Sequence, residues 1–404
     1  MYCKGMMAYY RFIILETIRH FRKNNGTLLA AALTYQGLLS FIPFLLLIFL
    51  LLGKYIMSSD VVFLNFKKTI SLFLPYSQDI IIKEARKLYI AEDNWSIASI
   101  AVCVWFTFPL VDGLKTLFSS VFKEKINRSF LRELASDVLS TFILMFLLVF
   151  LVLGEVVYIE IIKPIIKDIK APFDLIDVTG NFVLTLSGLI LFYYLFIPVK
   201  VKLNHIVAGA SLTAIAWIAL RPSFALLMHI NPQMGFVFGS LKAIFVVFFW
   251  VYMYFYVLIL GVELTASCSQ IRLIAVESLL SLRTAKPGAK ALARFTLNFR
   301  DGVVIFDKGT QADSFYYLVS GLVSLVEDGH PQVQKMSGDT FGVEEMLLNS
   351  TRAKTAVAKS DDVIVLPVHS NEFKALEKIN PQIPLMIIKN HLIPVEKNKK
   401  SILL

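Results

Sequence analysis

Long uncharged stretches alternate with segments that contain charged residues over roughly the first two thirds of the chain. Most of these stretches have the length of about 17 to 25 residues that a helix needs to cross about 30 Å of hydrocarbon. The six stretches are Leu28–Gly53, Trp95–Val111, Val138–Gly154, Val178–Val199, Ile206–Leu220 and Ala243–Val262. Arg221 and Pro222 interrupt the fifth, so a kinked or cavity-lining helix is expected there. The pattern predicts a polytopic α-helical membrane protein with about six transmembrane helices.

The pattern changes after Val262, where hydrophobicity falls. The segment from Ser267 is expected to be a helix that leaves the membrane and ends near Pro287 and Gly288. From Phe299 onward, short β-rich runs alternate with turn residues, which predicts a small β-roll, a double-sheet jelly roll with flanking helices. The predicted turn residues are Gly302, Gly309, Gly321, Gly338 and the hairpin pair Asp328-Gly329.

These boundaries divide the chain into three parts. We expect a transmembrane domain at residues 1–275, a helical connector at 276–286 and the β-roll domain at 287–404. Between the first two spans, residues 61–91 are apolar but broken by charges and Pro75. That segment is interpreted either as amphipathic helices at the membrane interface or as an ordinary folded loop.

The composition agrees with a membrane protein. Hydrophobic residues make up 56% of the chain and charged residues 17%, whereas soluble domains carry about 25% charged residues. The formal net charge is +10, and most basic residues lie near the ends of the predicted spans, where anionic lipid attracts them. Because nucleic-acid binding requires a clustered basic face, we expect membrane lipids, not nucleic acid, as partners. The same positions predict cytoplasmic termini.

Three charged residues near the ends of spans are candidates for an intramembrane polar path: Asp112, Arg221 and Glu263. A charge in hydrocarbon costs several kcal/mol unless it faces water or a partner. Extension of these side chains to the membrane surface is the alternative interpretation. The sequence shows no nucleophile–base pair and no metal-ligand spacing, so we expect neither an enzyme nor a metal site.

Several blocks of the membrane part resemble the YihY/BrkB family. They are "NGTLLAAALTYQGLLSFIPFLLLI" from Asn25, "NWSIASIAVCVWFTFPLVDGLKTLFSSVF" from Asn94, "VKLNHIVAGASLTAIAW" from Val201 and "FGSLKAIFVVFFWVYMYFYVLILGVELTA" from Phe238. The resemblance implies a six-helix protein of the bacterial inner membrane. It also implies transport or export, including of lipidic envelope material, as the expected activity.

The segment "GDTFGVEEMLLNSTRAKTAVAKSDDVIVLPV" from Gly338 resembles a cyclic-nucleotide-binding domain. A short helix after Gly342 would direct its free amides at the cyclic phosphate, and Arg352 would complete the neutralisation. The resemblance implies an acidic residue directly after the glycine for the ribose hydroxyl. Val343 stands there, followed by Glu344 and Glu345. Ala353, where the family often has Ser or Thr, favours cyclic AMP.

The resulting hypothesis is an inner-membrane transporter or exporter of unknown substrate, regulated by cyclic AMP at a site of Gly342, Glu344, Glu345, Arg352 and Ala353. Cyclic AMP would be a ligand, and no cofactor is expected. The alternative is a membrane-anchored sensor or scaffold whose degenerate roll docks a partner. Assembly into a homo-oligomer is left open.

Overall fold

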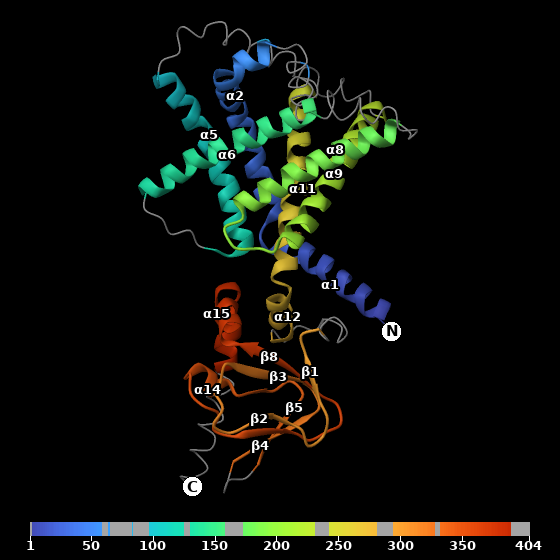
Figure 1. Ribbon diagram of the computed structural model, residues 1–404, viewed down its shortest axis with the longest axis vertical. Coiled ribbons are helices and arrows are strands. Elements are labelled where there is room, and N and C mark those ends of the chain that lie inside the picture. The colour runs from blue at the N-terminus through green and yellow to red at the C-terminus, as the bar shows by residue number, and fades with distance from the viewer. Residues whose placement is uncertain are drawn as a thin grey trace. The chain divides into compact units, whose positions relative to one another are not determined.

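The chain forms two compact units, shown in a computed structural model (Figure 1). One unit is Thr17–Ser269, and the other combines Met1–Glu16 with Gln270–Leu404. The structure describes residues 2–58, 64, 83, 97–124, 130–157, 173–230, 242–280, 294–327 and 332–388. The predicted turn at Asp328-Gly329 and nearly all of residues 61–91 lie outside this description.

The described residues of the first unit and of the amino-terminal segment are mainly helical. The helices include α1 (Tyr2–Lys23), α2 (Gly26–Ser58), α5 (Ile97–Phe122), α6 (Phe130–Val157), α8 (Phe173–Phe196), α9 (Leu203–Ile230) and α11 (Lys242–Ser269). Three of them are long and apolar enough to span a membrane within the described residues: Thr179–Phe196, Leu203–Leu220 and Val246–Ser269. A span count of six therefore stays a prediction. Helix α9 continues through Arg221 and Pro222 to Ile230, beyond the predicted end of the fifth stretch.

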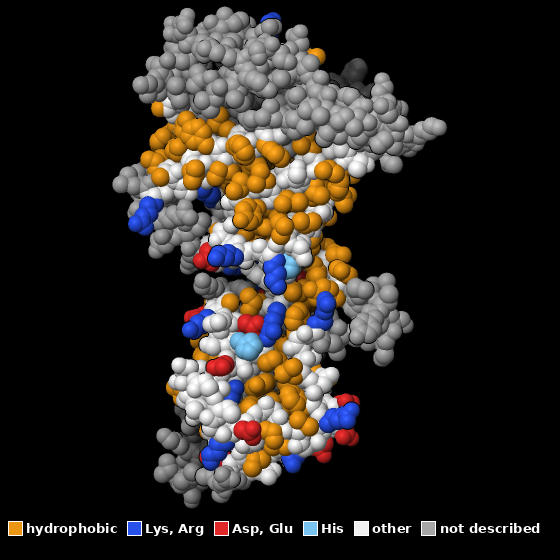
Figure 2. Space-filling view, in the orientation of Figure 1, with side chains coloured by type: hydrophobic (Ala, Val, Ile, Leu, Met, Phe, Trp, Pro, Cys, Tyr) orange, Lys and Arg blue, Asp and Glu red, His pale blue; other side chains and the backbone are white. Residues whose placement is uncertain are grey.

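Large hydrophobic side chains lie on the outside of the helical unit. Trp105 is 69% exposed, Leu139 62% and Ile215 59%, and Figure 2 shows a broad hydrophobic band over these helices. Helices of a water-soluble bundle turn such residues inward. The outer surface of the unit is therefore suited to lipid, which confirms a helical membrane region.

Helices α9 and α11 cross at two glycines. A Cβ atom on Gly209 would lie 2.3 Å from the backbone oxygen of Gly261, and one on Gly261 would lie 2.8 Å from the backbone oxygen of Gly209. One turn beyond each glycine, Thr213 and Thr265 donate to the carbonyls of Gly209 and Gly261 at 3.2 and 3.0 Å. Small residues of this kind let helix backbones approach closely in a membrane.

Tyr193 of α8 packs against the crossing of α9 and α11. Its side chain is fully buried, its hydroxyl lies 2.9 Å from Thr213 Oγ1, and it donates to the carbonyl of Leu258 at 3.1 Å. Three helices are therefore fixed to one another at this point. The surrounding core includes Phe118, Leu117 and Ile259, all nearly inaccessible to solvent.

The second unit is an antiparallel β domain, which confirms the predicted change of architecture. Its sheets have the strand orders β1-β8-β3-β6 and β2-β7-β4-β5. The strands are β1 (Leu297–Phe299), β2 (Val304–Phe306), β3 (Ser314–Ser320), β4 (Leu322–Val326), β5 (Val333–Met336), β6 (Thr340–Phe341), β7 (Thr355–Ala358) and β8 (Val363–His369). Strands β4 and β5, on either side of the predicted Asp328-Gly329 turn, pair antiparallel.

The described helices of this unit include α12 (Ile271–Leu280), α14 (Val343–Leu347) and α15 (Ser370–Ile379). Most side chains of α12 are buried. Four of them, Ala275, Val276, Leu279 and Leu280, share a core with Phe315, Val343, Met346, Leu366, Val368, Phe373, Leu376, Ile383 and Ile387. The helix that directly follows α11 is therefore part of the hydrophobic core of the second unit.

The glycine crossing generates a stability prediction. In Gly261→Ala, the new Cβ would lie 2.8 Å from the backbone oxygen of Gly209 and 2.5 Å from the Tyr193 hydroxyl, so the helices must separate. We expect a loss of about 1–3 kcal/mol, as for overpacked cores, measured as a lower melting temperature of the purified protein in detergent. Ile215→Ala, on an exposed position of α9, is the control. Equal melting temperatures for the two variants would contradict a tight crossing.

Candidate nucleotide site and membrane polar cluster

Gly342 connects β6 to the short helix α14. Its φ of +72° is left-handed, a conformation that glycine adopts without the steric cost of a side chain. Val343 and Met346 point into the core, whereas Glu344 is exposed and Glu345 is half-buried. Val343, in the position where the resemblance implies an acidic residue, is therefore a packing residue, and Glu344 lies on the outer face of the helix.

Two backbone hydrogen bonds fix the position of Arg352, which follows α14 in the chain. Its N–H donates to the carbonyl of Thr310 at 2.8 Å, and its carbonyl accepts from the N–H of Gly309 at 2.8 Å. These two bonds fix the chain after α14 against the loop between β2 and β3. The register of this pairing places the side chain inside the domain, where it is only 3% exposed.

The Arg352 guanidinium is held by two carbonyls and an aromatic ring. Nη1 donates to the carbonyl of Gly342 at 2.9 Å, and Nη2 donates to that of Ser314. The guanidinium carbon lies 4.2 Å from the centre of the Phe306 ring, a distance at which cation–π attraction is effective. Within the part of the chain that the structure describes, two of the five N–H groups of this arginine side chain donate to carbonyls.

The same contact explains why residue 342 is a glycine. A Cβ atom at Gly342 would lie 2.3 Å from Nη1 of Arg352, so the guanidinium would have to move away from the Gly342 carbonyl. Gly342 therefore allows both the left-handed turn into α14 and the close approach of the guanidinium. The resemblance implies that both residues belong to one site, and in the structure Arg352 Nη1 contacts Gly342.

The electrostatics identify the acidic neighbours of Arg352. Burial lowers the pKa of its guanidinium, while the charges of Tyr316, Glu345 and Asp313 act in the opposite direction. An arginine nevertheless stays protonated in proteins, so the site holds a permanent buried cation. Among the predicted acidic residues, it is Glu345 whose charge acts on Arg352. Ala353 is exposed.

The structure adds Phe306, Ser314 and Thr310 to the predicted site. They come from β2, β3 and the loop between them, at least 38 positions before Arg352. Nothing in the sequence indicated their contact with an arginine. Their contribution follows from sheet pairing, which brings distant segments together.

A second polar cluster lies in the helical unit around Glu263. This carboxylate on α11 is 1% exposed and accepts from Asn24 Nδ2 at 2.6 Å. Lys123 Nζ in turn donates to Asn24 Oδ1 at 2.6 Å. The cluster connects α11 with the α1–α2 turn and the end of α5. Of the other two predicted intramembrane residues, Asp112 is exposed on α5, and Arg221 lies in the part of α9 whose side chains are not described.

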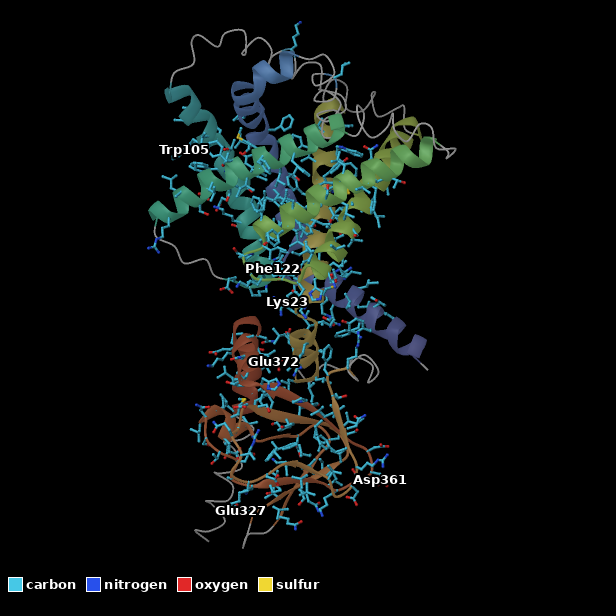
Figure 3. All side chains as sticks on the ribbon, viewed as in Figure 1. Lys23, Trp105, Phe122, Glu327, Asp361 and Glu372 are labelled. Carbon is cyan, nitrogen blue, oxygen red and sulfur yellow. The ribbon has the colours of Figure 1, made fainter. Side chains whose placement is uncertain are left out.

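Polar contacts attach α12 to α15 within the second unit. Arg272 Nε lies 2.5 Å from Glu372 Oε1 (Figure 3 labels Glu372), and Arg272 Nη2 donates to the carbonyl of Pro367 at 3.2 Å. Farther along α12, Glu277 Oε1 accepts from Asn380 Nδ2 at 3.3 Å. Glu372 also accepts from the backbone N–H of His369 at 3.0 Å. One glutamate thus holds both the start of α15 and the start of α12.

Two protein families match this chain, one over the helical part and the other over the β domain. The family model described as virulence factor BrkB matches residues 17–281, and the model of the cyclic nucleotide-binding domain matches residues 296–380. A UPF0761 membrane protein of Mannheimia succiniciproducens is 22% identical over 63% of this chain and 88% of its own length. One from Vibrio vulnificus is 23% identical over 65% of this chain and 83% of its own length.

Two solved structures are similar to part of this chain. A protein of a cyclic-GMP-dependent signalling pathway that regulates bacterial phytopathogenesis is 21% identical over 29% of this chain and 96% of its own, with a TM-score of 0.25. The catabolite activator protein of Thermus thermophilus is 21% identical over 31% of this chain and 63% of its own, with a TM-score of 0.26. The family models carry the assignment: the chain belongs to the YihY/BrkB family of membrane proteins and carries a cyclic-nucleotide-binding domain at its carboxyl side.

Proposed function

We propose that this protein is a bacterial inner-membrane transporter or exporter, not an enzyme, whose activity responds to a cyclic nucleotide bound at Arg352. The observation that carries the proposal is the guanidinium of Arg352, held against Gly342 at the start of α14. The first amides of a helix lack intrahelical partners and attract anions. A cyclic phosphate beside Gly342 would therefore meet helix amides and a fixed cation together.

The ligand would use the N–H groups of Arg352 that are not bound to Gly342 or Ser314. Charge-assisted bonds of this kind are shorter and stronger than neutral ones. Glu345 is the proposed acceptor for a sugar hydroxyl, since its charge acts on Arg352. Cyclic AMP is the first candidate ligand because Ala353 lacks the hydroxyl associated with guanine recognition.

Ligand binding is proposed to reach the membrane through α12. This helix begins at Ile271, two residues after α11 ends at Ser269, and Arg272 is bound to Glu372 of α15. A ligand can shift the membrane part only if it binds two of its states with different affinity. A change in the position of α15 would be passed through Arg272 to the end of α11.

Transport is proposed from the polar groups within the apolar helices. Glu263 is buried in a span and is bound to Asn24, which in turn is bound to Lys123. Ionisable residues inside membrane proteins commonly mark substrate or ion paths. We place the path beside this cluster, where α11 meets the ends of α1 and α5.

The nucleotide proposal predicts saturable binding of cyclic AMP to the full-length protein in nanodiscs, measured by titration calorimetry beside cyclic GMP. Arg352→Lys keeps the charge but lacks the planar fork. We expect it to lower affinity roughly tenfold or more, because hydrogen bonds to charged groups contribute about 1.5–3 kcal/mol.

Two further variants make this result interpretable. Arg352→Ala would leave the carbonyls of Gly342 and Ser314 unpaired, at a cost of about 1–3 kcal/mol, so its melting temperature must be measured before any loss of binding is assigned to the ligand. Lys354→Ala removes only a partly exposed partner of Glu327 at 3.4 Å and should bind like the parent. A stable parent protein that binds neither nucleotide would refute the site.

The transport proposal predicts that reconstituted protein moves at least one member of a panel of ions, fluorescent phospholipids and osmolytes across liposome membranes. Cyclic AMP is expected to change the rate in the parent protein. The substitution Arg272→Gln breaks the bond to Glu372, so it should leave nucleotide binding intact while removing the effect of the nucleotide on flux.

The matched control is Lys115→Gln, which removes an ion pair of 2.5 Å with Asp137 inside the helical unit. This variant should keep the nucleotide response. Absence of flux for the whole panel, with binding retained, would reject the transporter and support a membrane-anchored sensor or scaffold.

A further inference from the structure

The exposed face of α1 carries a stripe of large apolar side chains. Tyr10 is 58% exposed, Ile14 56% and Ile18 44%. Residues four apart lie on one face of a helix, so these three form a continuous row, and Leu15 lies beside it with 52% exposure. A helix exposed only to water has no reason to present such a row.

Charges of one sign border the stripe. Arg11 directly follows Tyr10, and Arg22 lies one turn beyond Ile18, both exposed. Glu16 is the sole acidic residue between Tyr2 and Lys23, and it is buried at 4% exposure. The exposed face of α1 is therefore apolar and cationic.

The end of α1 is fixed where the membrane helices begin. Two residues separate Lys23 from Gly26, the start of α2. Asn24 Nδ2 donates to Glu263 in the span of α11 at 2.6 Å, and the turn is closed by a bond of 2.8 Å from the Asn24 N–H to the His20 carbonyl. The carboxyl end of α1 is therefore attached to the end of a membrane-spanning helix.

We infer that α1 docks on the surface of an anionic phospholipid bilayer. Tyr10, Ile14 and Ile18 would enter the acyl boundary, and Arg11 and Arg22 would bind headgroup phosphates. Amphipathic helices with a basic polar face bind bilayers in this way, and anionic lipid adds attraction for each basic residue. A second copy of the same face suits the stripe less well, because it would oppose arginine to arginine with no exposed acid between them.

The test measures how deeply α1 lies in the membrane. Full-length protein, with its three native cysteines replaced, carries a spin label at Ile14→Cys or Ile18→Cys and is placed in nanodiscs of phosphatidylcholine with phosphatidylglycerol. Oxygen partitions into lipid, whereas a nickel chelate stays in water. We expect both labels to be relaxed preferentially by oxygen. The control label at Asp361→Cys, in an exposed turn of the β domain, should be relaxed preferentially by the nickel chelate.

A companion variant tests the anionic lipid. Nanodiscs of phosphatidylcholine alone should lower the oxygen preference at Ile14, and Arg11→Gln/Arg22→Gln should abolish the difference between the two lipid compositions. Preferential relaxation of the Ile14 label by nickel would overturn the inference, since the face would then be in water. Protection from both reagents would also overturn it, because protein would cover the face. A lipid response unchanged in the double variant would refute the role of the arginines.

Discussion

The crossing of α9 and α11 is the contact on which the remaining arrangement of the helical unit depends. Lipid supplies no hydrophobic force to push two apolar helices together, so their association depends on packing and hydrogen bonds. Because Gly209 and Gly261 have no side chains, the two backbones approach closely. The hydroxyls of Thr213 and Thr265 donate hydrogen bonds to carbonyls of their own helices. The crossing fixes α11 at Gly261, and it therefore also fixes Glu263, which lies two residues after Gly261 on the same helix. The bond of Glu263 to Asn24 then positions the start of α2.

In the β domain, Arg352 combines a structural role with the proposed binding role. Its guanidinium holds the carbonyls of Gly342 and Ser314 and stacks on Phe306. A buried cation is stable only where such partners replace water. The same fixation prepares the site, because a ligand then meets a cation whose position needs no further ordering. Loss of the arginine would therefore damage fold and ligand site together, which is why a lysine variant separates the two effects better than alanine.

Different parts of this architecture were accessible from sequence to different degrees. The stretches at Ile206–Leu220 and Ala243–Val262 indicated helices through composition alone, since a chain in lipid must satisfy its backbone internally. Gly342 and Arg352 were paired through a local motif. The link from Glu263 through Asn24 to Lys123 was not predicted, because it joins residues from three separate segments of the chain. Glu345 could not be separated from Glu344 by sequence, since the difference depends on the rotation of α14 and on the burial of Val343.

The two units are joined by two segments of the chain. The chain passes between them twice, within α1 after Glu16 and between Ser269 and Gln270. The second passage continues α11 into α12, whose Arg272 is bound to Glu372. A ligand that changes the preferred state of the membrane helices tenfold needs only about 1.4 kcal/mol of differential binding energy. A partly exposed ion pair contributes at most about 1 kcal/mol, so the proposed coupling also needs the packing of α12 in the core of the second unit. If nucleotide binding changes the affinity of the membrane helices for a second ligand, that ligand must change the nucleotide affinity by the same factor.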